Sequence, residues 1–346
     1  RMLLMPEAFI KLYKVKSGDC IQVRWYDDKA YRNIIIDCGY GNTFNQTLGP
    51  EIKRLKSNGE FIDLLILTHT HQDHIGGMKK IISSKNDDII KHCWFNGGRV
   101  NMNLDNSNKI SISKGIELDE YLISKGIGNT EKIMYDNKIY NIYGANIKIL
   151  SPRKEALEEF LLKFQEKIIL KNNKTTTSFC DWDIELEDFN LDEFYADAEL
   201  ENRISISFIM EIKNKKILFL ADSHPDEIAK SLKKLGYNVR NRLYVDYIKL
   251  SHHASKGNTS NELLDLIKCN NFIISTDGAN KDQFPHKETF ARILRHPLRN
   301  IDEKIKFIFN YDTPSLLNIF SNDDYGKYNF ECIYPERGKN NVKISI

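Results

Sequence analysis

The sequence predicts an α/β protein in which strands lead directly into helices. Short apolar strands dominate residues 9–39, and from residue 203 onward strands that end in Asp or His alternate with helices, as in "KILFLAD" followed by "PDEIAKSLKKLG". With 346 residues, 41% of them hydrophobic, the chain can bury one large core or two modest ones. We therefore expect a globular α/β chain.

The first hundred residues supply the clearest elements. The runs "FIKLYKV", "CIQVRWY" and "NIIIDCG" predict an antiparallel meander over residues 9–39. The stretch "GPEIKRLKSNG" predicts a helix, because Pro stands near its start and Gly just past its end. The run "FIDLLILT" then reads as a strand covered on both faces, and "GGMKKIISS" opens the next helix.

The pattern is less regular between residues 97 and 200. We interpret this segment as an insertion or subdomain within a domain that spans residues 1–300. Residues 301–346 return to short strands and turns, and we expect them to form a β-rich extension packed on that domain. The stretch 181–201 is heavily acidic, which predicts a solvated face.

Composition excludes several classes of protein. A net charge of +2 produces no global field toward DNA or an anionic membrane, so a polyanion would have to be held locally. The six cysteines are far apart and include no CxxC pair, which favours reduced thiols over disulfides or a zinc knuckle. No apolar run approaches the roughly 18–20 residues that span a bilayer. We expect a cytoplasmic protein without a membrane partner.

A cluster of metal-binding residue types follows the buried strand. The segment "THTHQDH" contains His69, His71, Asp73 and His74. Imidazole nitrogens and carboxylate oxygens suit zinc, manganese and iron. His69 and His71 are two residues apart, so their side chains point to the same side. Asp73 and His74 can turn to face a second ion. The spacing therefore suggests two metals.

The segment "THTHQDHIGG" resembles the signature of the metallo-β-lactamase-fold hydrolases. That resemblance implies an αββα four-layer sandwich, with two sheets face to face, helices outside and metals at one edge. It also implies further residues at later strand ends. These are Asp222 in "KILFLADS" as the metal-bridging carboxylate, His252 and His253 in "YIKLSHHAS", His286 in "QFPHKETF", and Asp37 in "IIIDCG" as a buried organiser of the backbone.

More narrowly, the order of motifs is similar to the hydrolase domain of ComEC-type DNA-uptake proteins and their soluble relatives. The corresponding pieces read "SGDC", "ENRISISF", "FLAD", "SHHAS" and "FPHK". The resemblance covers roughly residues 9–96 and 202–296. It implies two divalent ions, zinc or manganese.

One position departs from the family pattern. A further ligand histidine usually lies between the first motif and the bridging aspartate, and His92 is the only histidine in that interval. Its place in "IIKHCWF" favours a structural role. Asn202 occupies the expected position instead, and its amide oxygen tolerates harder ions better than zinc. We therefore expect one metal site to be weaker, loaded with manganese, or empty until substrate arrives.

The resemblance implies a metal-dependent phosphodiesterase, in particular a nuclease, that uses a metal-bound hydroxide. Asp73 would orient that hydroxide. Since only one late ligand is needed, we assign His286 to the metal, and His252 or His253 becomes the general acid for the leaving group. Adjacent residues of an extended segment point opposite ways, so we expect one of the pair to face the metals and favour His252. His252 also stays a candidate ligand.

Two other functions stay open. One is hydrolysis of small esters, lactones or thioesters. The other is a weakly active scaffold or sensor subunit of a bacterial defence system, with a protein partner. For the phosphodiesterase we expect a nucleic acid or nucleotide substrate, with single strands or ends preferred, because the net charge is close to zero.

Overall fold

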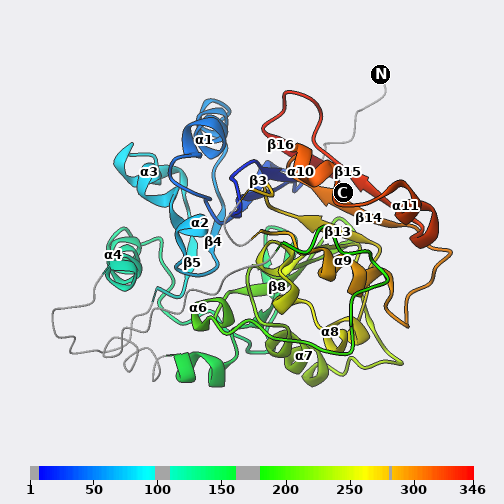
Figure 1. Ribbon diagram of the computed structural model, residues 1–346. Coiled ribbons are helices and arrows are strands. Elements are labelled where there is room, and N and C mark those ends of the chain that lie inside the picture. The colour runs from blue at the N-terminus through cyan, green and yellow to red at the C-terminus, as the bar shows by residue number, and fades with distance from the viewer. Residues whose placement is uncertain (1–7, 98–109, 161–179, 280–282) are drawn as a thin grey trace.

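The computed structural model describes residues 8–97, 110–160, 180–279 and 283–346. Two β-sheets lie face to face, with α1 to α4 outside one sheet and α7 to α9 outside the other (Figure 1). This arrangement confirms the predicted αββα four-layer sandwich. Within the described residues, no helix combines the length and apolarity needed to cross a membrane.

The first sheet has six strands in the order β16-β1-β2-β3-β4-β5. The predicted meander is confirmed as β1 (Phe9–Tyr13), β2 (Ile21–Tyr26) and β3 (Tyr31–Ile36), which pair antiparallel. Strands β4 (Leu64–Leu67) and β5 (Cys93–Phe95) continue parallel to β3, and β16 (Asn341–Ser345) pairs antiparallel with β1. Its helices are α1 (Leu48–Ser57), α2 (Gln72–Ile75), α3 (Met78–Ser83) and α4 (Ile110–Ser124).

The second sheet has eight strands in the order β15-β14-β13-β11-β9-β8-β7-β6. Its antiparallel part contains β6 (Tyr140–Ile142), β7 (Ala145–Ser151), β8 (Ser207–Ile212) and β9 (Lys215–Phe219). Its parallel part continues from β9 through β11 (Tyr247–Lys249), β13 (Asn271–Ile274), β14 (Ile305–Phe309) and β15 (Phe330–Ile333). A separate parallel pair consists of β10 (Leu243–Tyr244) and β12 (Ile267–Lys268).

The helices between these strands are mostly short. They are α6 (Leu200–Arg203), α7 (Pro225–Lys234), α8 (Asn261–Leu266), α9 (Lys287–Leu294), α10 (Pro314–Leu317) and α11 (Asn322–Tyr328). Residues 154–160 are also helical. Helix α7 has Pro225 in its first turn, where the missing N–H costs no hydrogen bond, and two lysines in its last turn, where they face the negative end of the helix dipole.

Three apolar clusters correspond to the three interfaces of the sandwich. Between the sheets, Val23 and Ile66 of the first sheet pack with Phe208 and Ile273 of the second. Outside the first sheet, strand residues such as Leu65 pack against α1 and α3, and the outer face of the second sheet is buried against α7, α8 and α9. Strand β4 is buried along its whole length, as its continuous apolar sequence predicted.

The predicted insertion 97–200 and the predicted extension 301–346 each contribute to both sheets. Of the predicted insertion 97–200, residues 98–109 and 161–179 lie outside the described part of the chain. The rest supplies α4 to the first sheet and β6 and β7 to the second. Residues 301–346 supply β14 and β15 to the second sheet and β16 to the first.

Candidate metal centre

The predicted metal-binding residues follow strands of both sheets. Residues 69–74 follow β4 in the first sheet, Asp222 follows β9, and His252 and His253 follow β11 in the second. The amide N–H of Ile206 donates to the carbonyl of Thr68 at 2.9 Å, which joins the two sheets beside the motif. The candidate site therefore lies at one edge of the sandwich, where strands from both sheets end.

The histidine loop is held by close backbone approaches. A Cβ atom on Gly18 would lie 2.3 Å from the carbonyl oxygen of Asp73, and one on Gly77 would lie 2.3 Å from the carbonyl oxygen of Cys38. The N–H of Asp19 donates to the same Asp73 carbonyl at 3.2 Å. Glycine in "SGDC" and in "HIGG" is thus needed because no side chain fits there.

Two groups of ligand atoms form around Asp222. The first contains Asp73, His74, Asp222 and His253, and the second contains His69, His71 and Asp222; within each group the ligand atoms lie within 4.8 Å of one another. Asp222 belongs to both groups, so it can bridge two ions. All of these residues except His71 and Asp73 are buried.

The buried atoms of these groups fit a divalent metal. Both carboxylate oxygens of Asp222 and the Nε2 atoms of His69, His74 and His253 are buried without a hydrogen-bond partner. Each such atom costs about 1–3 kcal/mol if nothing compensates it. The opposite nitrogens are occupied, because His74 Nδ1 lies 2.7 Å from Asp37 Oδ2 and His253 Nδ1 donates to the carbonyl of Ser275 at 2.8 Å. With Nδ1 held in this way, Nε2 of His74 and of His253 would be the nitrogen available to a bound ion.

Asp37 connects the loop to the strand beneath it. Its carboxylate accepts hydrogen bonds from the backbone N–H of Thr68 at 2.8 Å and from the Thr68 hydroxyl at 2.7 Å, in addition to its contact with His74. Asp37 is fully buried and, with Asp19 and His74, forms a third acidic group below the site. Asp19 forms an ion pair with Lys249, which is also buried.

The electrostatics favour a bound cation. Burial disfavours the imidazolium form of His74, but the surrounding carboxylates, Asp222 first among them, raise its pKa well above the usual value. Burial also raises the pKa of Asp222, yet the neighbouring histidines outweigh this effect and lower the pKa well below its ordinary range. The site thus concentrates negative charge that divalent ions would neutralise.

His252 lies beside the cluster but belongs to neither group. Its Nε2 is 3.9 Å from Asp222 Oδ2, and its Nδ1 is 3.2 Å from Asp197 Oδ2 and 3.2 Å from Asn258 Oδ1. Burial lowers the pKa of His252, but Asp222 and Asp197 outweigh it and raise the pKa to about 9. The side chain is 20% exposed, so it can contact a bound substrate.

Asp197 is the residue that the sequence reasoning missed. It belongs to the acidic stretch 181–201, whose composition predicted a solvated face; this prediction was wrong for Asp197, whose side chain is only 9% exposed. Its carboxylate accepts hydrogen bonds from Asn202 Nδ2 at 2.8 Å and Asn258 Nδ2 at 3.1 Å. No local pattern separates Asp197 from the exposed carboxylates of the same stretch, so the sequence offered no signal for it.

The remaining predicted residues lie outside the two groups. His286 precedes α9, and its Nδ1 accepts the N–H of Lys256 at 3.2 Å. Burial, then Lys256 and His252, lower the pKa of His286 to about 4, which favours neutral imidazole. His92 is exposed just before β5, at the strand end away from the motif. Asn202 is buried, and its Oδ1 has no hydrogen-bond partner.

One family model matches part of this chain. Residues 27–92 match the family described as "Metallo-beta-lactamase superfamily". A search of curated proteins finds no match. Among solved structures, the metallo-beta-lactamase fold protein YhfI from Bacillus subtilis aligns at 10% identity and a TM-score of 0.44. The alignment covers 97% of this chain and 99% of that one.

Other structural alignments are also distant. The CmlA β-hydroxylase E377D mutant aligns at 12% identity and a TM-score of 0.43, covering 99% of this chain, which spans only 54% of that protein. A long-form RNase Z from yeast aligns at 14% identity and a TM-score of 0.36, covering 78% of this chain and 36% of that one. The αββα sandwich, together with the match of residues 27–92 around the histidine motif, gives this chain the fold of the metallo-β-lactamase superfamily.

Proposed function

We propose that this chain is a metal-dependent phosphodiesterase that acts on a nucleic acid or nucleotide. The proposal depends on the position of His252, whose imidazole lies beside the two ligand groups but belongs to neither. Its Nε2 lies 3.9 Å from Asp222 Oδ2, while Asp197 holds its Nδ1. Cleavage of a phosphodiester requires a proton for the leaving oxygen, and a half-buried imidazole in this position can donate it.

The two groups around Asp222 would hold the metals. Two divalent ions, zinc or manganese, would supply Lewis acidity and an activated water when bound. Asp73, whose side chain is 20% exposed, has a carboxylate oxygen 3.4 Å from His253 Nε2 and can orient that water and accept its proton. His252 would then protonate the leaving oxygen through Nε2.

The geometry changes one assignment made from the sequence. We now propose His253, in place of His286, as the late metal ligand, because its buried Nε2 lies 3.4 Å from Asp73 Oδ2 and 3.9 Å from Asp222 Oδ2. Among the residues that the structure describes, the second group offers only His69, His71 and Asp222. We infer that this second site binds its ion more weakly than the first.

A substrate panel tests the proposal. Protein reconstituted with zinc or manganese should hydrolyse bis-p-nitrophenyl phosphate faster than a thioester or nitrocefin. Replacing His69 and His71 together by Ala should abolish that activity and reduce metal content, whereas His92→Gln, a histidine substitution at an exposed site, should change neither. Preferred turnover of the thioester or nitrocefin would replace the proposal with a carbonyl hydrolase. Absence of turnover with both metals bound would favour a scaffold or sensor role.

A further inference from the structure

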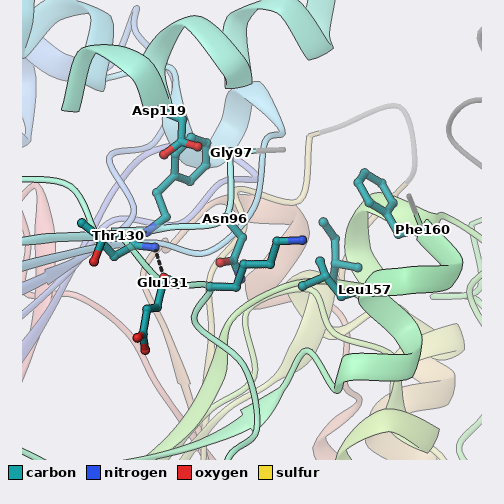
Figure 2. Close-up of a pocket in the computed structure, with 11 residues that line it drawn as sticks. Asn96, Gly97, Asp119, Thr130, Glu131, Leu157 and Phe160 are labelled. Carbon is teal, nitrogen blue, oxygen red and sulfur yellow. Dashed lines mark hydrogen bonds between the residues drawn. The ribbon is translucent and has the colours of Figure 1, made fainter. Parts of the chain in front are cut away.

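A small pocket opens beside the candidate metal centre. Strands β4 and β5 are parallel neighbours, with Leu67 paired to Phe95, so Asn96 and Gly97 continue at the level of Thr68 and His69. The pocket begins at these residues and is closed by Asp119 of α4, by residues 129–132, by the helix at 154–160 and by Ile204 (Figure 2). The strand end that begins the pocket is therefore the direct neighbour of the strand end that carries the histidine motif.

Close packing fixes this pocket relative to the motif. A Cβ atom on Gly115 of α4 would lie 3.0 Å from Thr70 Cγ2, within the histidine loop. A Cβ atom on Gly97 would lie 2.5 Å from Cβ of Asp119. On the other side, Ile204 stands two residues after Asn202, which contacts Asp197 and His252. The pocket thus lies between two segments that also build the candidate site.

The polar wall is already formed without a ligand. The Asn96 side chain donates to the carbonyl of Ile133 at 2.6 Å and accepts the N–H of Ile133 at 2.9 Å. The Asn129 side chain accepts the N–H of Phe95 at 2.7 Å and donates to the carbonyl of Glu131 at 2.7 Å. These bonds fasten the loop to β5, so a ligand would meet a rigid wall.

The two sides of the pocket differ in chemistry. Leu157, Phe160 and Ile204 pack together as one apolar cluster and form one side. Figure 2 shows Leu157 and Phe160 facing Asn96 across the pocket, with Thr130 and Glu131 beyond it. A ligand that matches both sides needs an apolar face and a polar edge.

We propose that this pocket binds an unpaired nucleobase next to the scissile phosphate. A nucleobase has apolar faces that stack on Phe160 and polar edges that meet the Thr130 and Glu131 side, whereas an acyl chain would leave that side unmatched. The cavity volume of about 130 Å³ accommodates one ring system, well below the roughly 300–1,000 Å³ of drug-sized sites. This inference rests on the proposed function, because it takes the reaction to be cleavage of a phosphodiester. It adds that the substrate is single-stranded.

Binding tests the pocket apart from catalysis. Thymidine 5′-monophosphate and 2-deoxyribose 5-phosphate share a phosphate and differ by the base. By calorimetry, the metal-reconstituted protein should bind the nucleotide about 5- to 150-fold more tightly, the factor expected for one stacked base. Phe160→Ala should bring the ratio close to one, and Phe61→Ala, at an exposed phenylalanine before β4, should leave it unchanged. If Phe160→Ala does not fold, Ile204→Ala replaces it.

Several outcomes would overturn the inference. These are equal binding of the two ligands by the parent protein, an unchanged ratio in Phe160→Ala, or the same loss in Phe61→Ala. Kinetics with thymidine 5′-p-nitrophenyl phosphate and methyl p-nitrophenyl phosphate separate the two proposals. Cleavage of both diesters at equal kcat/KM rejects the pocket and keeps the function; base-dependent binding without cleavage of either diester rejects the function and keeps the pocket.

Discussion

His252 and His253 are adjacent, yet both imidazoles reach the cluster, because the backbone is left-handed at this point. His252 has φ 45° and ψ 54°, and His253 has φ 55° and ψ 31°. Residues other than glycine rarely adopt this conformation, which costs of order 1–3 kcal/mol and is concentrated at functional sites. An extended segment would have pointed the two rings to opposite sides. The turn therefore places both rings where the proposed roles, metal ligand for His253 and proton donor for His252, would require them.

The first prediction at the residue scale concerns metal content. His253→Ala should lose most of one metal equivalent, because it removes a ligand from the group formed by Asp73, His74 and Asp222. His286→Ala should retain both metals, since its ring lies outside both groups. Elemental analysis of protein purified without chelator, with circular dichroism to confirm folding, measures this. Loss of metal from His286→Ala alone would restore the assignment made from the sequence.

The second prediction concerns Asp197. Asp197→Asn removes the carboxylate opposite His252 Nδ1, so the doubly protonated ring, which is the form that can donate a proton through Nε2, is less stabilised. Turnover of a diester with an alkoxide leaving group should fall about 10- to 1,000-fold, with KM and metal content nearly unchanged. With p-nitrophenolate as leaving group the loss should be much smaller.

A conservative substitution of Asp197 and a substitution of His252 test whether the two residues act together. Asp197→Glu should recover part of the activity on the alkoxide diester, and His252→Gln should show the same dependence on the leaving group. Combined with Asp197→Asn, His252→Gln should add little further loss, because both changes remove one function. Equal losses on both kinds of leaving group would indicate a structural role for Asp197.

At the scale of elements, the acidic segment 180–199 is a strap that runs over α8 and α9. Arg292 donates to the carbonyls of Leu191 and Glu193, and Arg295 donates to those of Leu186 and Phe189. These bonds hold the strap by its backbone, which leaves most of its carboxylates exposed. Asp197 lies near the end of the strap, so the attachment of the strap positions that residue in the candidate site.

Asp181 at the start of the strap caps helix α9. Its carboxylate accepts the backbone N–H groups of Lys287 at 2.8 Å and Glu288 at 3.0 Å. Asp181→Ala should therefore lower the free energy of unfolding by about 0.5–2 kcal/mol, measured by urea denaturation. Asp183→Ala removes an exposed carboxylate from the same strap and serves as the matched control. Equal stability of the two variants would contradict the capping role.

The sequence predicted those parts of the fold and site that depend on local pattern. The meander of residues 9–39 and the buried strand before the motif follow from the spacing of apolar residues, and four of the proposed ligands lie within six positions. The contacts of Asp197 were not predictable, because His252 and Asn258 meet it only through tertiary packing. The left-handed turn at His252 was missed because no glycine marks it.

At the scale of the whole molecule, acid stability should depend on Glu60, which joins three elements. It accepts hydrogen bonds from Arg24 of β2 at 2.8 and 2.9 Å, from Asn33 of β3 at 3.1 Å and from Arg54 of α1 at 3.3 Å. Burial raises the pKa of Glu60, but the bonds from Arg24 and Asn33 outweigh it and lower the pKa to about 2. The carboxylate thus stays charged in the folded protein well below its usual pKa.

The sign of the pH effect follows from this shift. Between its ordinary pKa of 4.5 and about 2, the unfolded chain binds a proton at Glu60 that the folded chain does not. The stabilisation is therefore complete above about pH 4.5 and is lost as the pH falls toward 2. Urea titrations at pH 7 and pH 3 should show Glu60→Gln less stable than the parent at pH 7, with a smaller gap at pH 3. A gap independent of pH would contradict this.

The pairing of β16 with β1 means that the first sheet gains this edge strand after β1 to β5 have been synthesised. Tyr13 pairs with Asn341, so this edge of the first sheet stays open until synthesis has passed residue 341. Contacts between residues so distant in sequence form slowly, because a very long loop must close first. A nascent chain that has not reached residue 341 already contains the histidine motif and most of both sheets. It also exposes the bare edge of β1, a surface on which a second chain can add a strand.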